Sequence, residues 1–421
     1  MLSRDLGGWR LPAVVSLLAF AVYVLTASHV HQGDTPVYVE QIRNKEWLAW
    51  QHMLPHVIAG RALGLTDHYW PGLGTYPVLC TLDAATGAAA VGLLCRLVLR
   101  WSGSAWTAAL AALALAASNT FWQTATTYEL ALFPLIPLLA AALLATGPAD
   151  QPISVSATFG VGALVALAMG CHTLAAGTLP AWVLLLATQP GPRRDRAAAV
   201  AVFLAVFLFG TLLLYQSLLS TVSDLPGRTV WSELDRSLQQ AATPDGDDQP
   251  AWFAVRGLGA AILAPRERPV GGMVACLWLA VLAVGSFLRR RALWARYGAW
   301  SVWPAAWIVG VLLVAIRVEP GNAEYYVQPI AAALCWTAML VTVSPVPAWG
   351  QAALGGFALA LIGVNAGPVW GRHTASPVHT ELRAGPGGPV HPPPSNDADP
   401  TGPRANPRGP YPPPTTPGRT P

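Results

Sequence analysis

Long runs of apolar residues, separated by short polar intervals, dominate the chain from residue 10 to residue 366. A helix that crosses a membrane needs about 20 mostly apolar residues, and most of the runs approach that length. They predict about eleven spanning helices. The expected spans lie near residues 11–28, 72–98, 103–118, 128–146, 155–171, 173–189, 198–219, 269–288, 298–316, 324–343 and 349–366. We therefore expect an all-α fold, a polytopic transmembrane helix bundle.

Two of these runs are irregular. Pro134 and Pro137 fall early in the run 128–146, where they predict a kink that neighbouring helices must accommodate. The break at 171–173 leaves two interpretations open, namely two short helices or one long kinked helix.

Three segments do not fit a spanning helix, and they set the expected domain organisation. Residues 29–70 and 220–268 form two outside segments within a membrane domain that covers 1–366. Residues 367–421 hold 16 of the 38 prolines and few apolar residues. Such a composition cannot bury a core, so we expect a disordered Pro-rich tail.

Composition supports the membrane interpretation. Hydrophobic residues make up 53% of the 421 residues and charged residues 11%, whereas soluble domains carry about 25% charged residues. This excludes an ordinary soluble enzyme. The net charge of +4 is too small and dispersed for a nucleic-acid surface. The five cysteines lie in or beside apolar runs without metal-ligand spacing, which favours helix packing over a disulfide framework.

The arginines are sorted to alternate connections between the runs. With a cytoplasmic N-terminus, the short inside segments hold Arg4, Arg10, Arg96, Arg100, Arg193, Arg194, Arg196, Arg289, Arg290, Arg291 and Arg296. This positive-inside pattern predicts a multi-pass membrane protein with its N-terminus inside. The 18 tryptophans are expected to serve mainly as an interfacial belt. The residues that suggest this belt are Trp9, Trp70, Trp101, Trp106, Trp122 and Trp294.

The outside segments carry most of the acids and histidines, so they are where we expect chemistry. Asp34 follows the first run in a Gly33–Asp34–Thr35–Pro36 turn. A partly desolvated carboxylate there could act as a general base, or it could simply cap a turn or helix.

His52 and His56 are four residues apart and could share a helical face near Arg61. They could bind a metal or an anionic lipid head group, or they could be interfacial histidines with no ligand; His-x-x-x-His alone is a weak motif. Glu129 ends the polar stretch 119–129 and could be catalytic or a helix-start residue. His172, between two apolar runs, is a functional candidate or a hydrogen-bonded structural residue.

A late outside connection holds Arg317, Glu319, Glu324 and Tyr325. Arg317 goes against the arginine sorting, which suggests a purpose such as holding a phosphate. A salt bridge to Glu319 or Glu324 is the alternative.

In order along the chain, these clusters resemble the polytopic glycosyltransferases of the C-type fold. The likeness is greatest to bacterial membrane proteins related to protein O-mannosyltransferases. It covers about residues 10–345 and rests on five short motifs: 33–35 after the first span, 51–64, 121–129, 168–180 and 324–329. The chain departs from the family pattern in two ways. Thr35 replaces the usual second acid beside Asp34, and no large folded extracytoplasmic domain is present in the sequence.

The resemblance implies transfer of a sugar from a polyprenyl-phosphate donor to an envelope acceptor on the extracytoplasmic face. Asp34 would deprotonate the acceptor and Glu129 would position the acceptor, His52 or a metal. Arg317, His52 and His172 would stabilise the leaving phosphate. His56, Arg61, Glu324 and Tyr325 are further candidates for substrate binding. No cofactor is required, although a divalent metal is possible.

Two other functions remain open. A lipid or solute transporter or flippase would show internal repeats and polar residues deep in its spans, and no convincing repeat is found. A non-catalytic scaffold would present the Pro-rich tail to a partner.

Overall fold

The computed structural model describes residues 8–28, 35–44, 52–147, 150–221, 229, 252–264, 268–318 and 320–374. Within these ranges every regular element is a helix, which confirms the predicted all-α class. The α-helices are α2 (Arg10–Leu25), α3 (Thr35–Arg43), α4 (Met53–Tyr69), α5 (Thr75–Ser102), α6 (Ala105–Ala117), α7 (Asn119–Thr126), α8 (Leu135–Ala145), α9 (Val155–Cys171), α10 (Leu179–Thr188), α11 (Arg193–Thr221), α13 (Phe253–Ile262), α14 (Arg268–Tyr297), α15 (Trp303–Val318), α16 (Val327–Thr342) and α17 (Pro347–Thr374). Three short 3₁₀ helices join them: η2 (Thr173–Thr178), η4 (Gly298–Ser301) and η5 (Ala323–Tyr326).

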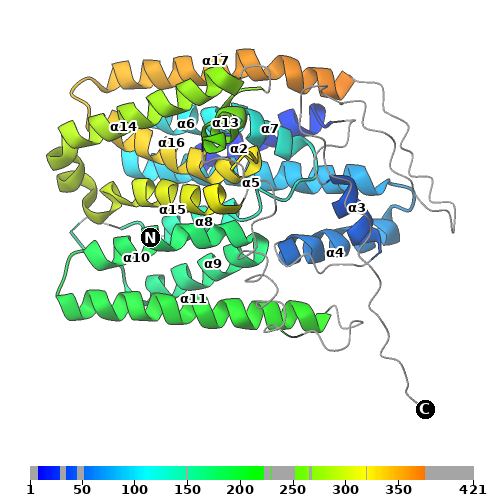
Figure 1. Cartoon of the computed structure of the whole chain (residues 1–421), viewed down its shortest axis with the longest axis horizontal. Helices are drawn as coiled ribbons and strands as arrows, with labels where there is room; N and C mark the ends of the chain where they lie inside the picture. The colour runs from blue at the N-terminus through cyan, green and yellow to red at the C-terminus, as the bar shows by residue number, and fades with distance from the viewer. Residues whose placement is uncertain are drawn as a thin grey trace. The chain divides into compact units, whose positions relative to one another are not determined.

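Most of the long helices run side by side, with α17 and α11 on opposite sides of the bundle (Figure 1). In the described ranges, five helical segments are long and apolar enough to cross a membrane. They are Thr75–Ser102, Arg193–Leu219, Val270–Ser301, Ala323–Thr342 and Pro347–Thr374. Shorter apolar helices accompany them. The chain is a multi-pass membrane protein, and the count of eleven spans stays a prediction.

The expected helix over 128–146 is wrong for residues 128–134. Helix α7 ends at Thr126 and α8 begins only at Leu135, so a non-helical segment separates them. Pro134 directly precedes α8 and Pro137 lies in its first turn. A proline there loses no intrahelical hydrogen bond, so the two prolines begin a helix instead of kinking one.

The break near residue 172 separates two segments. Helix α9 ends at Cys171, and His172 has an extended backbone with φ −162° and ψ 127° before η2 begins. The end of the membrane domain also differs from the prediction. Helix α17 continues to Thr374, so residues 367–374 are helical and not part of a disordered tail. Residues 375–421 lie outside the described residues.

Small residues allow close contact between η2 and α15. A Cβ atom added to Gly177 would lie 2.8 Å from Cα of Val311 and 3.0 Å from the carbonyl oxygen of Gly310. Only a glycine permits that approach. Tight packing of this kind is how helices associate in membranes, where lipid tails are as apolar as the side chains.

The tryptophans divide into two groups. Trp9, Trp70, Trp106 and Trp294 are exposed, as an interfacial belt requires, but Trp101 and Trp122 are buried and do not belong to it. Trp101 joins a buried cluster whose other members are Trp182, Trp300, Trp303 and Trp307. The surplus of tryptophan therefore serves core packing as well as anchoring. Among the cysteines, all five are free and four are buried, whereas Cys276 is exposed, contrary to its expected packing role.

Candidate functional site

One end of the bundle collects buried polar side chains from segments far apart in the sequence. The contributing segments are α3, the start of α4, the third turn of α5, the connection between α7 and α8, the break after α9, and η5. Figure 1 shows α3 and α4 together beside the N-terminal end of α5. We call this group the polar cluster. Its buried members are Thr35, Tyr38, His52, His56, Asp83, Tyr128, Glu129 and His172.

Glu129 is held on two sides. The hydroxyl of Thr35 donates to Oε1 of Glu129 at 2.6 Å and to the carbonyl oxygen of Tyr128 at 3.1 Å. The backbone N–H of Glu129 donates to Oδ2 of Asp83 at 2.9 Å. Glu129 is not at a helix start, because the segment between α7 and α8 is non-helical. Its position is therefore set by tertiary hydrogen bonds and not by a helix dipole.

The three predicted histidines meet in this cluster. The ring centroids of His52 and His172 are 4.4 Å apart in an edge-to-face contact, and those of His52 and His56 are 6.4 Å apart. Nδ1 of His56 lies 2.8 Å from the carbonyl oxygen of His52, and a carbonyl oxygen only accepts, so this nitrogen carries the proton. Nδ1 of His172 instead accepts the backbone N–H of Leu174 at 3.0 Å.

Burial decides the charge of the two histidines in the segment 29–70. It lowers the pKa of His52 well below its ordinary value, and the neighbouring His172 and His56 lower that pKa further. Burial also lowers the pKa of His56. Both rings are therefore neutral near pH 7. They can donate or accept a hydrogen bond, but they do not supply positive charge.

Tyrosine rings complete the walls of the polar cluster. Tyr38 lies edge-on to His52, His56 and Tyr128, with ring centroids 5.6, 5.3 and 6.4 Å away. Tyr325 lies edge-on to His172 at 5.8 Å. The η5 segment thus reaches the histidines, as the candidate role of Tyr325 requires.

The other predicted site residues do not all join this cluster. Glu324 interacts electrostatically with Asp83, which places it at the edge of the cluster. Arg61 on α4 and Arg317 in the last turn of α15 are exposed. Asp34, the predicted general base, lies outside the described residues, although the next residue, Thr35, contacts Glu129.

Asp83 is a member of the cluster that the sequence interpretation missed. It is fully buried in α5 and is the only acidic residue in the apolar run 72–98. An ionisable side chain inside a membrane span marks a functional candidate, so a signal was present. Tyr38 and Tyr128 gave no comparable signal, because tyrosines are common near membrane interfaces.

The described residues do not assemble a metal site by themselves. No group of three or more His, Cys, Asp or Glu side chains within the described ranges could hold a metal ion. Nδ1 of His56 and Nδ1 of His172 are engaged with backbone groups. Asp34 lies outside these ranges, and the possible divalent metal stays a prediction.

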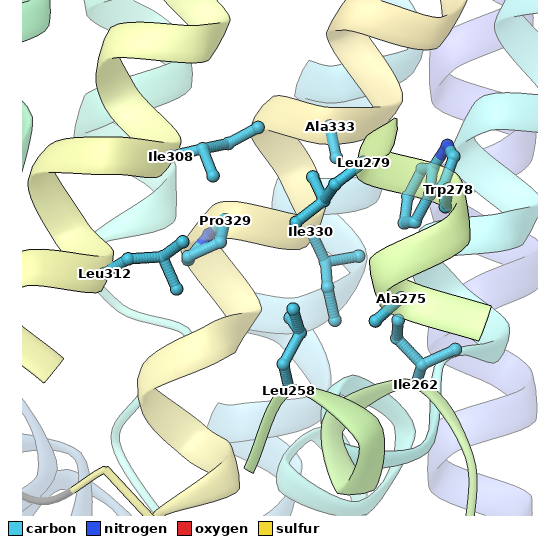
Figure 2. A pocket seen from close by; sticks show the side chains of 10 residues that line it. All are labelled: Leu258, Ile262, Ala275, Trp278, Leu279, Ile308, Leu312, Pro329, Ile330 and Ala333. Atoms are coloured by element: carbon cyan, nitrogen blue, oxygen red, sulfur yellow. The ribbon is translucent and has the colours of Figure 1, made fainter. Parts of the chain in front are cut away.

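Two hollows lie away from the polar cluster. Figure 2 shows a small apolar one between α13, α14, α15 and α16, where Leu258, Leu312 and Ile330 are among the lining residues and all the others are also nonpolar. A cavity of about 220 Å³ has a mixed lining that includes Thr146, Gln189 and Trp300. None of the predicted site residues lines either hollow.

Solved structures of two membrane proteins share this arrangement of helices. ArnT from Cupriavidus metallidurans, solved bound to undecaprenyl phosphate, matches with a TM-score of 0.57 and 17% identity, over 85% of this chain and 64% of that one. AglB, an oligosaccharyltransferase from Archaeoglobus fulgidus solved with an inhibitory peptide and a dolichol-phosphate, matches with a TM-score of 0.51 and 13% identity, over 86% and 55%. The fold is that of ArnT and AglB.

The apo form of the A. fulgidus oligosaccharyltransferase matches equally well, with a TM-score of 0.51 and 12% identity. This chain spans less than two thirds of the length of ArnT and of AglB. No family model and no curated protein matches the sequence. The fold agrees with the expected resemblance to polytopic glycosyltransferases, whereas the narrower likeness to protein O-mannosyltransferases stays a prediction.

Proposed function

We propose that this protein is a membrane glycosyltransferase that moves a sugar from a polyprenyl-phosphate donor to an acceptor on the extracytoplasmic face. The observation that carries the proposal is the buried Glu129–Asp83–histidine cluster at one end of a fold shared with ArnT and AglB. Both of those proteins were solved with a polyprenyl phosphate. A cluster of acids and histidines at one end of such a bundle suits chemistry at a membrane surface.

In the proposed reaction Asp34 is the general base. Its carboxylate takes the proton of an acceptor hydroxyl, and the acceptor oxygen then attacks the anomeric carbon of the sugar. The bond between that carbon and the phosphate oxygen breaks, with inversion, and the lipid phosphate leaves. Thr35 is next to Asp34 in the sequence and bonds to Glu129, which supports a role for Glu129 in positioning the acceptor.

The neutral histidines change the proposed roles at the phosphate. His52 and His56 would orient the donor through hydrogen bonds, because burial lowers the pKa of each ring. Positive charge for the phosphate would come from Arg61 or Arg317, whose exposed side chains can reach a lipid head group. His172, Glu324 and Tyr325 would contact the sugar, since Tyr325 lies against His172.

The proposed location is a bacterial inner membrane, with the N-terminus in the cytoplasm and the polar cluster outside. The arginine sorting supports this orientation.

A sugar-transfer assay tests the proposed function. Purified protein is incubated with labelled polyprenyl-phosphate sugars and an extract of cell envelope, and loss of label from the lipid is measured. We expect transfer by the natural protein and none by Asp34→Asn, a nearly isosteric change. Asp195→Asn, at the start of α11, is the matched control and should retain transfer. Wild-type turnover by Asp34→Asn would show that Asp34 is not the general base.

A further inference from the structure

A strained turn lies next to Glu129. The backbone of Leu130 has φ +62°, the one positive φ of a non-glycine residue in the described ranges. The N–H of Ala131 donates to the carbonyl oxygen of Glu129 at 2.7 Å, which closes a three-residue turn around Leu130. A γ-turn with positive φ is rare and strained for an L-residue. Leu130 is buried, so solvent does not relieve that strain.

Asp83 holds this turn from the side of α5. Its Oδ2 accepts the N–H of Glu129 at 2.9 Å, and its carboxylate also bonds the N–H of Leu130. A carboxylate that accepts two neighbouring backbone N–H groups fixes the peptide planes of both residues. Strained backbone persists only where its surroundings over-determine it, and Asp83 supplies that constraint.

Thr35 bonds other atoms of the same segment. Its hydroxyl bonds the carbonyl oxygen of Tyr128 and the carboxylate of Glu129. The N–H groups of Glu129 and Leu130 therefore point to Asp83, while the carboxylate of Glu129 points to Thr35, the residue after Asp34. The turn at residues 128–130 thus orients the carboxylate of Glu129 toward Thr35.

We propose that Asp83 is a positioning residue: it locks the strained turn at Leu130 and thereby aims the carboxylate of Glu129 at the start of α3. The proposal rests on the role given above to Glu129. Asp83 itself need not touch the substrate. Its Oδ1 is buried without a hydrogen-bond partner in the structure, so the grip on the turn is made through Oδ2.

Two substitutions of different severity test the hydrogen bonds between Asp83 and the turn. Asp83→Leu removes every acceptor and should lower kcat of sugar transfer about a hundredfold, because small misplacements of a reacting group have effects of that size. Asp83→Asn keeps one acceptor oxygen for the N–H of Glu129 and should recover part of that loss. The KM for the donor should change little in both variants. Thr86→Val is the control, since the Thr86 hydroxyl bonds only within α5, to Leu82.

A double-mutant cycle separates positioning from general stability. If Asp83 acts through Glu129, then Asp83→Asn should cause little further loss of kcat in a Glu129→Gln background. A purely structural role predicts that the two losses multiply. Multiplying losses would overturn the proposal.

Hydrogen exchange tests the clamp without any enzymatic assay. Asp83→Asn should speed amide exchange in the segment 127–134, and Thr86→Val should not. Equal exchange in the two variants would overturn the inference. Failure of the natural protein to transfer sugar would instead overturn the proposed function, and hydrogen exchange would still decide whether Asp83 holds the turn.

Discussion

The two ends of helix α5 bury opposite kinds of side chain. Near its start Asp83 grips the backbone beside Glu129, and at its other end Trp101 packs against Trp300 with ring centroids 5.4 Å apart. Eighteen residues separate Asp83 from Trp101, which corresponds to about 27 Å along a helix. Helix α15 makes the same connection, from Trp303 in the aromatic cluster to Arg317, shortly before η5. One end of the fold is thus built from directed hydrogen bonds and the other from ring packing.

Both ends contain buried polar atoms without a hydrogen-bond partner, and these differ in kind. At the aromatic end they are indole nitrogens of Trp101, Trp182, Trp303 and Trp307. In the polar cluster they are Oδ1 of Asp83, Nδ1 of His52, Nε2 of His56 and the hydroxyl of Tyr128. An indole contributes mostly apolar surface. A carboxylate or imidazole has little reason to be buried without a chemical task. Loss of the first group should therefore reduce stability, and loss of the second should reduce function.

The largest expected effect is on stability, from Trp303→Ala. Trp303 contacts Trp182 at 5.2 Å and Trp307 at 4.8 Å between ring centroids, and it is buried. Truncation of a buried tryptophan typically costs about 3–5 kcal/mol. We expect that loss in the free energy of unfolding, measured in detergent micelles, with unchanged transfer per folded molecule. Trp106→Ala, at a 72% exposed position, is the control. A comparable loss in the control would remove the distinction between belt and cluster.

The next largest effect is on activity and leaves stability unchanged. Glu129→Gln should lower kcat about a hundredfold, or about 2.7 kcal/mol of transition-state stabilisation, because the carboxyl group is lost from a preorganised site. Its free energy of unfolding should stay close to that of the natural protein, because the amide oxygen can still accept from Thr35. Glu40→Gln, on the exposed side of α3, is the matched control. Unaltered kcat in Glu129→Gln would show that the carboxylate has no part in the reaction.

The sequence predicts the helices better than it predicts the turn beside Glu129. Apolar runs locate most helices because a helix needs apolar residues both where it faces lipid and where it packs in the protein core. They fail at 128–134, where residues 130–134 are apolar but Asp83 and Thr35 impose a turn. That turn depends on partners 46 and 94 residues away. Local pattern carries no information about such contacts.

Candidate site residues were predictable where a polar side chain interrupts an apolar run. His52, His56, Glu129 and His172 all belong to the polar cluster. Asp83 carried the same signal but lies within a span and not at its end. The aromatic cluster could not be predicted, because an interfacial tryptophan and a buried one at a span end look alike in sequence.

The third effect is a pH dependence confined to the polar end. Burial lowers the pKa of His52 and of His56, so below about pH 6.5 the unfolded chain binds protons that the folded chain does not. Stability should therefore be constant above about pH 7 and should fall below about pH 6.5. The slope is about 1.4 kcal/mol per pH unit for each histidine that stays neutral. The melting temperature between pH 8 and pH 5 measures it.

The double variant His52→Gln plus His56→Gln should flatten that profile. His172 contacts His52 and remains in the variant, so it can contribute a residual slope; Tyr38 and Tyr128 also face these rings but do not titrate between pH 5 and pH 8. His68→Gln, at an exposed position about three turns further along α4, is the control and should leave the slope unchanged. A double variant with the natural slope would mean that these two rings take up protons in the folded protein.

The smallest effect concerns the exposed arginine at the same end as the polar cluster. If Arg317 supplies charge to the donor phosphate, Arg317→Gln should raise the KM for the polyprenyl-phosphate sugar about two- to fivefold, since exposed ion pairs contribute at most about 1 kcal/mol. Its kcat and melting temperature should not change, because Arg317 is outside the packed core. Arg291→Gln, an exposed position on α14, is the control for loss of one positive charge. An equal change in KM for both variants would mean that the donor senses only the net charge of the protein. In that case the specificity for phosphate would reside in the polar cluster alone.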